Sequence, residues 1–315
     1  MFTQAELSSL IQKGVDTIEY SARAPRLFDP VRYTLESGGK RIRPTMVLMA
    51  ANIFSEDITP AITPAIGLEM YHNFTLLHDD VMDKAPDRRG RATVHVKWDD
   101  NTAILSGDAM LSMAFDLVSK VADNKLRAIL NLFTRTTIEI DEGQQLDMEF
   151  ETRDDVKVEE YIEMIRLKTS VLLGCALKMG AIIGGASEKD ADILYNFGVN
   201  IGLAFQLQDD WLDCWGDPKT FGKRIGGDIL CNKKTFLRIT AEKTATIPET
   251  NGLSEQEKID TIKAFYIETK AEEACRKEIA FYHKKAMEDL AEISVPEEKL
   301  SLLKALAAKL ENRNI

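Results

Sequence analysis

Hydrophobic residues recur along most of the chain at steps of three and four, which is the spacing of one face of an α-helix. The stretches 126–133, 161–172 and 194–205 all show this pattern. No proline occurs in the sequence between Pro86 and Pro218. Because proline breaks helix interiors, a gap of that length permits a series of long helices.

Alternation typical of β-strands is scarce, and residues 93–98, TVHVKW, are the one short strand candidate. We predict ten or more helices. Ser187 and Ser254 precede acidic residues and are predicted to cap two of them. The Lys/Glu-rich part from about residue 242 is expected to form a solvated helical hairpin. Breaks are predicted near residues 38–39, 57–60, 86–90, 122–125, 153–156, 184–187, 216–233, 247–255 and 294–297.

None of these breaks is long enough or biased enough in composition to be a linker. We therefore predict an all-α protein in which residues 1–315 form a single domain. Hydrophobic content of 44% and charged content of 29% are ordinary for a globular protein of 315 residues. The net charge of -11 argues against non-specific nucleic-acid binding, which requires a basic surface.

The sequence shows no signal peptide, and no apolar run approaches the roughly 20 residues of a membrane span, so we expect no membrane anchor. Four cysteines occur without a Cys-x-x-Cys pair or a histidine cluster. We therefore expect buried free thiols rather than disulfides or a zinc site. Free thiols favour a reducing compartment, so a cytoplasmic location is expected.

Two acidic motifs with the same spacing stand out, LLHDDVMDKAPDRRG at 76–90 and FQLQDDWLD at 205–213. On a helix, Asp79 and Asp83 lie on one face about 6 Å apart, and so do Asp209 and Asp213. The second pair extends an apolar stripe and is expected to point inward. Carboxylates so placed repel each other unless a cation lies between them.

Magnesium suits such pairs, because it takes oxygen ligands and commonly binds one or two carboxylates together with substrate phosphates. A single motif of this kind is more often a solvated helix end, but two with identical spacing are unlikely to arise by chance. Asp80 and Asp210 fall about 100° around the helix from these pairs and are expected to act indirectly.

Basic residues accompany both motifs. Arg88 and Arg89 follow the first, and SGGKRIRP at 37–44 adds more after a glycine turn, although it is not a P-loop. Lys168 interrupts an apolar helix face. A glycine-rich loop at 216–233 follows the second motif and could be a lid. Taken singly, a solvated turn, a snorkelling lysine and a surface loop remain alternatives. Taken together, these cations indicate metal-assisted binding of diphosphate, with two anionic groups rather than one.

The motifs GGKRIRP, HNFTLLHDDVMDKAPDRRG, GQQLD, RLKTS, FQLQDDWLD and GK…D…NKK occur in an order that closely resembles the trans-isoprenyl diphosphate synthases, or polyprenyl synthetases. The resemblance covers residues 30–240. It implies an all-α helical bundle around a central cavity, usually homodimeric. It also implies an enzyme that condenses an allylic diphosphate with isopentenyl diphosphate.

The resemblance also implies roles for individual residues. Three magnesium ions would be held by Asp79, Asp83, Asp209 and Asp213. The allylic diphosphate would contact Arg88, Lys168, Lys223 and Lys233. Isopentenyl diphosphate would contact Lys40, Arg43, His72 and Arg89. Thr169 and Gln206 would lie beside the developing carbocation.

Product length is implied by the residues just before the first motif. In the family, a bulky aromatic five residues before the first aspartate gives short products, and here that residue is Phe74, followed by Thr75. The combination resembles geranylgeranyl synthases most, with farnesyl synthases next. Alternatively Phe74 is ordinary core, and Met70 or a neighbouring helix sets the floor.

Two other functions share parts of this pattern. A class I terpene cyclase has the helical fold and the first motif, but it usually replaces the second with an Asn/Ser/Glu-type metal motif. A non-catalytic helical partner of a synthase would not need both motifs and all of the cations. The complete set therefore favours chain elongation.

Overall fold

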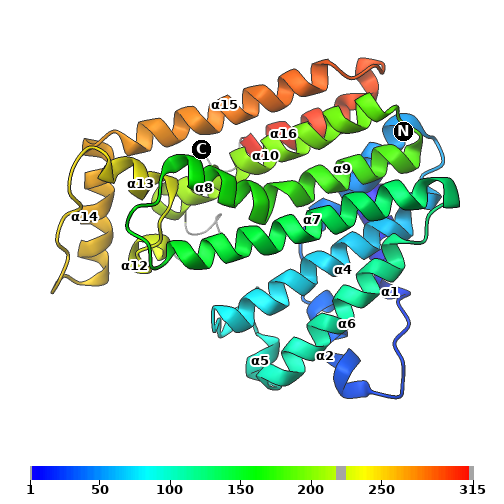
Figure 1. Cartoon of the computed structure of the whole chain (residues 1–315), viewed down its shortest axis with the longest axis horizontal. Coiled ribbons are helices and arrows are strands. Elements are labelled where there is room, and N and C mark those ends of the chain that lie inside the picture. Colours follow the sequence, from blue (N-terminus) through cyan, green and yellow to red (C-terminus); the bar gives the residue numbers. More distant parts are fainter. Residues whose placement is uncertain (1, 218–224, 312–315) are drawn as a thin grey trace. The chain divides into compact units, whose positions relative to one another are not determined.

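The computed structural model describes residues 2–217 and 225–311, and its regular structure is almost entirely α-helical (Figure 1). The all-α prediction is confirmed. Contacts divide the chain into two compact units, one of Met1–Phe133 and Ala176–Ala191, the other of Thr134–Cys175 and Asp192–Ile315. The predicted single domain and central cavity remain predictions. The helices that contribute residues to both units are α7 (Asp123–Phe150), α9 (Val171–Gly184) and α10 (Glu188–Trp215).

In the first unit, α4 and α6 run side by side and make its most extensive helix pairing (Figure 1). Small residues permit the close approach. A Cβ added to Gly67 would lie 2.8 Å from the backbone nitrogen of Val118, and Gly107 of α6 faces the ring of His78. The helices of this unit are α1 (Gln4–Asp16), α2 (Pro25–Glu36), α3 (Ile42–Phe54), α4 (Thr59–Met82), α5 (Val94–Lys97) and α6 (Asp100–Val118).

In the second unit, α10 is fixed along one side by polar contacts to the C-terminal helices. Asn200 donates to Asp289 Oδ2 of α15 at 2.7 Å, and Gln208 donates to the carbonyl of Glu311 in α16 at 3.0 Å. A π-helical turn, Arg166–Ser170, separates α8 from α9. The other helices are α8 (Val158–Ile165), α12 (Gly227–Leu230), α13 (Phe236–Glu242), α14 (Glu255–Glu268), α15 (Ala271–Ala291) and α16 (Ser301–Glu311).

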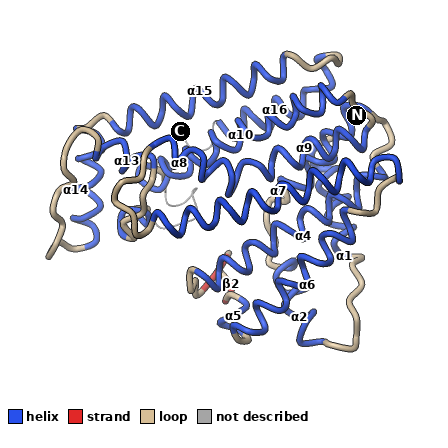
Figure 2. Tube along the Cα trace, viewed as in Figure 1, coloured by secondary structure: helices blue, strands red, loops and turns tan. Residues whose placement is uncertain are grey.

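The helix boundaries largely follow the predicted breaks (Figure 2). The proline-free stretch contains two helices of 28 residues each, α7 and α10. Ser187 accepts the backbone N–H of Asp190, and Ser254 forms a capping box with Glu257. Both predicted caps are therefore confirmed. The predicted break at 247–255 lies in the long loop between α13 and α14, drawn in tan in Figure 2.

Two local predictions were wrong. The strand candidate at 93–98 is instead the short helix α5, because the Thr93 and Val94 carbonyls accept the N–H groups of Lys97 and Trp98. The β structure in residues 2–217 and 225–311 consists of β1 (Asp87–Arg88) paired antiparallel with β2 (Arg91–Ala92). The C-terminal part is not a solvated hairpin: α14, α15 and α16 each bury apolar side chains.

One helical stretch, Val158–Gly184, is long and apolar enough to cross a membrane by length and composition. The sequence analysis did not anticipate this, because Lys168 and Lys178 interrupt the stretch. Within the structure 72% of it is buried. A core helix of a soluble protein passes the same test, so the finding is weak evidence for a membrane span.

Glycine brings α9 and α10 into backbone contact in the second unit. A Cβ at Gly198 would lie 2.7 Å from both Cα and N of Gly174, and one at Gly202 would lie 2.7 Å from Cα of Ser170. These contacts fix the distance between the π-helical turn and the middle of α10. Helix backbones have no flexible atoms that could yield to an added methyl group.

We predict that Gly198→Ala lowers the free energy of unfolding by about 1–3 kcal/mol, because the methyl group forces the two backbones apart. Chemical denaturation of the two proteins measures the difference. Asn196→Ala, at an exposed position of the same helix, serves as the control and should be neutral or slightly stabilising. Equal stability of Gly198→Ala and wild type would show that α9 and α10 are not in tight contact.

Candidate functional site

The predicted site residues lie in two groups, one in each unit. The first group surrounds the end of α4. Asp79 and Asp83 lie on the last turn of this helix, and the N–H of Asp83 donates to the carbonyl of Asp79 at 2.8 Å. Asp79 is half-buried and Asp83 is exposed, whereas Asp80 between them is buried. The two carboxylates spaced by four thus lie on the more accessible side of the helix.

Asp80 turns inward and holds Arg88. The Arg88 Nε donates to Asp80 Oδ1 at 2.7 Å. Burial raises the pKa of Asp80, and the charge of Arg88 opposes that rise. The predicted indirect role of Asp80 agrees with this contact, because the aspartate orients a cation next to the pair formed by Asp79 and Asp83.

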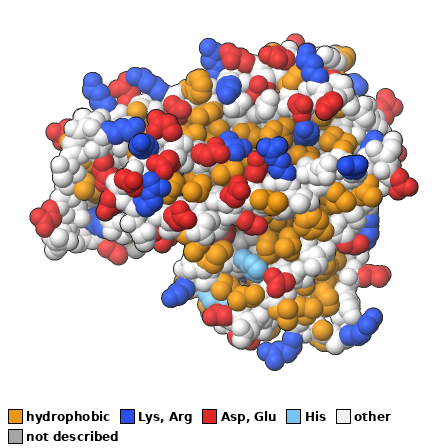
Figure 3. Space-filling model, viewed as in Figure 1, with side chains coloured by type: hydrophobic (Ala, Val, Ile, Leu, Met, Phe, Trp, Pro, Cys, Tyr) orange, Lys and Arg blue, Asp and Glu red, His pale blue; other side chains and the backbone are white. Residues whose placement is uncertain are grey.

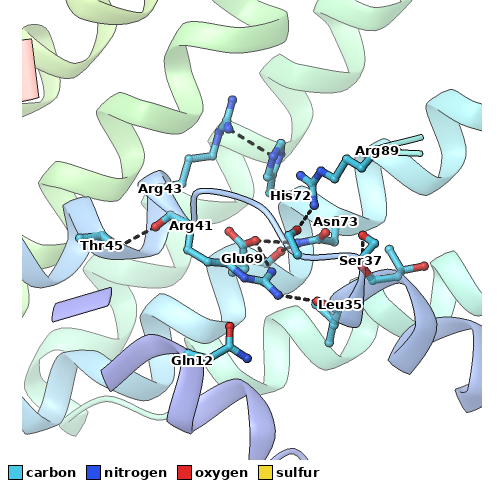
Figure 4. Close-up of polar contacts among 12 residues, drawn as sticks. Gln12, Leu35, Ser37, Arg41, Arg43, Thr45, Glu69, His72, Asn73 and Arg89 are labelled. Atoms are coloured by element: carbon cyan, nitrogen blue, oxygen red, sulfur yellow. Dashed lines mark hydrogen bonds and ion pairs between the residues drawn. The ribbon is translucent and has the colours of Figure 1, made fainter. Parts of the chain in front are cut away.

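Arg89 joins two loops that are far apart in sequence. It adopts a left-handed backbone conformation with φ of 55°, and its guanidinium donates to the carbonyl of Gly38 (Figure 4). Gly39, beside the Arg89 guanidinium, has φ of 136°, a backbone conformation that favours glycine. The turn before α3 and the β1–β2 hairpin therefore present their cations from the same region.

Arg43 and His72 form a second part of this basic cluster, with Arg43 Nη1 3.2 Å from His72 Nε2 (Figure 4). Burial lowers the pKa of His72 well below its usual value, and Arg43 and three further arginines lower it more. The imidazole is therefore neutral near pH 7. Because a guanidinium only donates, Nε2 accepts and the ring proton lies on Nδ1.

Lys40 and Arg41 have different roles despite being adjacent. Lys40 is exposed, whereas Arg41 is buried with φ of 45°. Arg41 forms an ion pair with Glu69 Oε1 at 2.5 Å and also donates to the Leu35 carbonyl (Figure 4). Arg41 thus fixes the basic turn that carries Lys40 and Arg43. The sequence analysis missed Glu69, although a lone acid within the apolar run AIGLEMY was a usable signal.

Phe74 and Thr75 lie one turn before the first acidic motif. The Phe74 side chain is buried between Tyr71 and His78, with ring-centroid distances of 5.5 and 4.7 Å. Thr75 is half-buried and donates to the carbonyl of His72. These contacts place Phe74 in the core of the first unit beneath the motif. Its role as the floor for the product remains a prediction.

The second group surrounds the end of α10. Asp213 is buried, as expected from the apolar stripe, and Asp209 is half-buried. The Asp213 carboxylate accepts the N–H of Asp228 at 3.1 Å, and its carbonyl accepts the N–H of Gly226. Asp213 therefore also anchors the start of α12, a structural role that the spacing alone did not indicate.

Asp210 lies at the centre of a buried network. The fully buried Tyr161 donates its hydroxyl to Asp210 Oδ2, and Gln206 donates to Oδ1 at 3.4 Å. Thr169 in turn donates to Gln206 Oε1 at 3.5 Å. Burial, together with the charge of Asp228, raises the pKa of Asp210 to about 8. The network joins Thr169 to Gln206 and includes Tyr161, which had been assigned only to an apolar helix face. The place of Thr169 and Gln206 beside a carbocation remains a prediction.

Lys168 lies in the π-helical turn and donates to Asp147 Oδ2 at 2.5 Å. Insertions of this kind in α-helices often mark functional sites. Lys233 is exposed and acts electrostatically on both Asp147 and Asp210. Lys223 lies outside the described residues. Asp147 is the last residue of the GQQLD motif, to which the sequence analysis had given no role.

The carboxylate oxygens of the two motifs suit magnesium better than a metal whose ligands all come from the protein. Within residues 2–217 and 225–311, no three His, Cys, Asp or Glu side chains converge on a common metal position. The acidic motifs instead offer pairs of carboxylate oxygens. Magnesium usually binds to one or two carboxylates and completes its coordination with water and substrate phosphates.

The fold and these two groups define a class of all-helical proteins whose paired aspartates are combined with cations suited to diphosphates. Residues 24–270 match the model of the Polyprenyl synthetase family, and the chain belongs to this family. A geranylgeranyl diphosphate synthase of Methanosarcina mazei is 41% identical over 236 residues, which cover 74% of this chain and 73% of that relative.

Solved structures agree over the full length. A crystal structure of geranylgeranyl pyrophosphate synthase is 43% identical, with a TM-score of 0.94 and 100% of both chains covered. The geranylgeranyl pyrophosphate synthetase from Pyrococcus horikoshii Ot3 is 32% identical, with a TM-score of 0.91, and the match covers 99% of this chain and 98% of that one.

We predict that Glu69→Gln lowers the free energy of unfolding by about 3–5 kcal/mol, because Arg41 is left as a buried charge without an anionic partner. Chemical denaturation provides the measurement. The double variant Glu69→Met with Arg41→Met removes both charges and should recover much of the loss. A double variant as unstable as the single one would show that the ion pair does not organise this turn.

Proposed function

We propose that the protein is a chain-elongating prenyltransferase that condenses isopentenyl diphosphate with an allylic diphosphate and releases mainly geranylgeranyl diphosphate. One observation carries the proposal: each of the two acidic motifs has its own group of basic side chains within its unit. Two separate sets of cations suit a reaction with two diphosphate substrates. Family membership and the named relatives support the same reaction.

The first unit offers the site for isopentenyl diphosphate. Lys40, Arg43 and Arg89 supply positive charge, and His72 supplies a neutral N–H donor. Arginine binds phosphate oxygens through a planar fork, which orients as well as attracts the ligand. Because this diphosphate is not cleaved, its site needs to hold and aim the substrate without stabilising a leaving group.

The allylic diphosphate must lose its bond to carbon, and that requires its growing negative charge to be neutralised. Arg88, Lys168, Lys223 and Lys233 are proposed to contact it. Asp79, Asp83, Asp209 and Asp213 are proposed to hold magnesium, with three ions in the loaded enzyme. When bound, these ions supply Lewis-acid stabilisation of the leaving diphosphate.

Thr169 and Gln206 are proposed to lie beside the allylic cation. Thr169 donates to Gln206 Oε1, and Gln206 Nε2 donates to Asp210. These hydrogen bonds hold both side chains in place. The double bond of isopentenyl diphosphate then attacks the cation, and a proton leaves the adduct. The released diphosphate is proposed to accept that proton. The side chains around the allylic cation must exclude water, because water would otherwise react with the cation.

The alternatives are not favoured. A class I terpene cyclase uses one diphosphate substrate and does not require the cations around Arg43 and His72. A non-catalytic partner does not require the network of Asp210, Gln206 and Thr169. The named relatives are geranylgeranyl synthases rather than cyclases.

We further propose a homodimer of single-domain chains in the cytoplasm. Apolar side chains on α6 support self-association, since Ile104 and Leu105 are 45% and 60% exposed. Figure 3 shows hydrophobic side chains gathered over α6 on the visible face of the first unit. Exposed apolar patches of this kind commonly mark protein interfaces. Sedimentation of the purified chain measures the mass directly.

The proposed function is tested by incubating the purified protein with labelled isopentenyl diphosphate, magnesium and dimethylallyl, geranyl or farnesyl diphosphate. Products are then separated by chain length. We expect a 20-carbon diphosphate from each primer. Formation of cyclic hydrocarbons without isopentenyl diphosphate would instead indicate a cyclase, and the absence of any labelled product would support a non-catalytic partner.

We predict that Asp79→Asn and Asp209→Asn each reduce kcat at least a hundredfold at saturating magnesium, because metal stabilisation of the leaving group is worth several kcal/mol. Steady-state assays give the rate, and circular dichroism confirms that the variants remain folded. Asp141→Asn, at an exposed position of α7, is the control for loss of one negative charge. Near-normal turnover in either motif variant would rule out a metal site at that aspartate.

We predict that Phe74→Ala shifts the products beyond 20 carbons, because removing the ring opens space beneath the first motif. The variant should also lose about 3–5 kcal/mol of stability, as buried phenylalanine truncations do. Phe115→Ala truncates another ring of the first unit and controls for that loss. An unchanged product distribution in Phe74→Ala would remove Phe74 as the floor.

A further inference from the structure

Asp147 forms an ion pair with Lys168, one of the cations of the second group. Its Oδ2 accepts from Lys168 Nζ at 2.5 Å, and both side chains are mostly buried, with 19% and 27% exposed. Burial acts to raise the pKa of this carboxyl, but Lys233 and Lys168 together lower it below its usual value. Asp147 is therefore ionised and lies in the field of two lysines.

The local backbone is built to make this contact. Gly143, one helical turn before Asp147, faces the backbone of Lys168, and a Cβ there would lie 2.8 Å from the Lys168 Cα. α7 therefore approaches the π-helical turn Arg166–Ser170 very closely. The extra residue of a π-helical turn changes the direction of the side chains that follow it. Both features bring the Lys168 ammonium group onto Asp147.

The pairing has a consequence for catalysis. Lys168, one of the lysines that the proposed function assigns to the allylic diphosphate, already has a counter-charge in the protein. A flexible lysine side chain loses conformational entropy when it binds a ligand. An existing ion pair orders the side chain before the ligand arrives, so less entropy is lost on binding. The same negative charge opposes a second anion nearby, because like charges repel over this range.

We propose that Asp147 is a positioning residue that holds the ammonium group of Lys168 until the allylic diphosphate competes for it. This inference rests on the proposed function. Asp147 keeps the lysine oriented for the transition state and, by the same charge, weakens ground-state binding of diphosphate. It thereby favours release of the inorganic diphosphate that the reaction leaves behind. Binding energy withheld from the ground state raises turnover rather than affinity.

Asp147→Asn keeps the shape of the side chain and removes the charge. We expect it to bind inorganic diphosphate about fivefold more tightly, since one unit charge near the site is worth about that factor in watery surroundings. We also expect kcat to fall about tenfold or more. Titration calorimetry with inorganic diphosphate and magnesium measures the affinity, and the labelled isopentenyl diphosphate assay measures kcat.

Two variants separate this role from a structural one. Asp147→Glu retains the charge and should restore most of the wild-type affinity and rate. Glu149→Gln removes a charge from an exposed position two residues along α7, where the Glu149 carboxylate accepts from Gln145. It should leave both values unchanged. If the role of Asp147 were only structural, the Asp147→Asn protein would be less stable and would bind diphosphate more weakly than wild type.

The outcomes also distinguish this inference from the proposed function. Wild-type protein that makes no labelled product and binds no diphosphate overturns both. Wild-type protein that is active, with unchanged or weaker diphosphate binding in Asp147→Asn, overturns the role of Asp147 alone. Tighter binding combined with slower turnover supports it.

Discussion

Charge neutralisation at the ends of two helices is the constraint on which the rest of this structure depends. Carboxylates on one helix face repel each other, and partly buried cations lose hydration, so each needs a partner of opposite charge or a hydrogen-bond donor. Asp80 holds Arg88, Asp147 holds Lys168, and Asp210 takes the hydroxyl of Tyr161. The outer aspartates of the two motifs, Asp79, Asp83, Asp209 and Asp213, are the ones that we propose to hold metal ions.

The constraint explains why neighbouring residues of one kind differ in role. Arg41 is buried against Glu69 and maintains the turn, while Lys40 beside it is exposed. Lys234 is buried against Asp154, while Lys233 acts on Asp147 and Asp210. In each pair one cation is buried in an ion pair and its neighbour is exposed. The exposed member, Lys40 or Lys233, is the one that we propose to contact a diphosphate.

Most of the fold could be predicted because helix periodicity and proline spacing are local signals. Both acidic motifs were found for the same reason, since a spacing of four defines one helix face. Glu69, Tyr161 and Asp147 were missed in their roles because their partners are 28, 49 and 21 residues away in sequence. The helix at 94–97 was misread because its β-branched residues favour a strand, whereas the local hydrogen bonds are helical.

Our central proposal is that this chain binds diphosphate through metal ions held by its acidic motifs. Titration calorimetry of a non-cleavable allylic diphosphate analogue, with magnesium and then with a chelator, tests it most directly. We predict binding that weakens at least a hundredfold when magnesium is removed, with the same loss in Asp79→Asn at saturating magnesium. Affinity that is independent of magnesium, or unchanged in that variant, would contradict the claim.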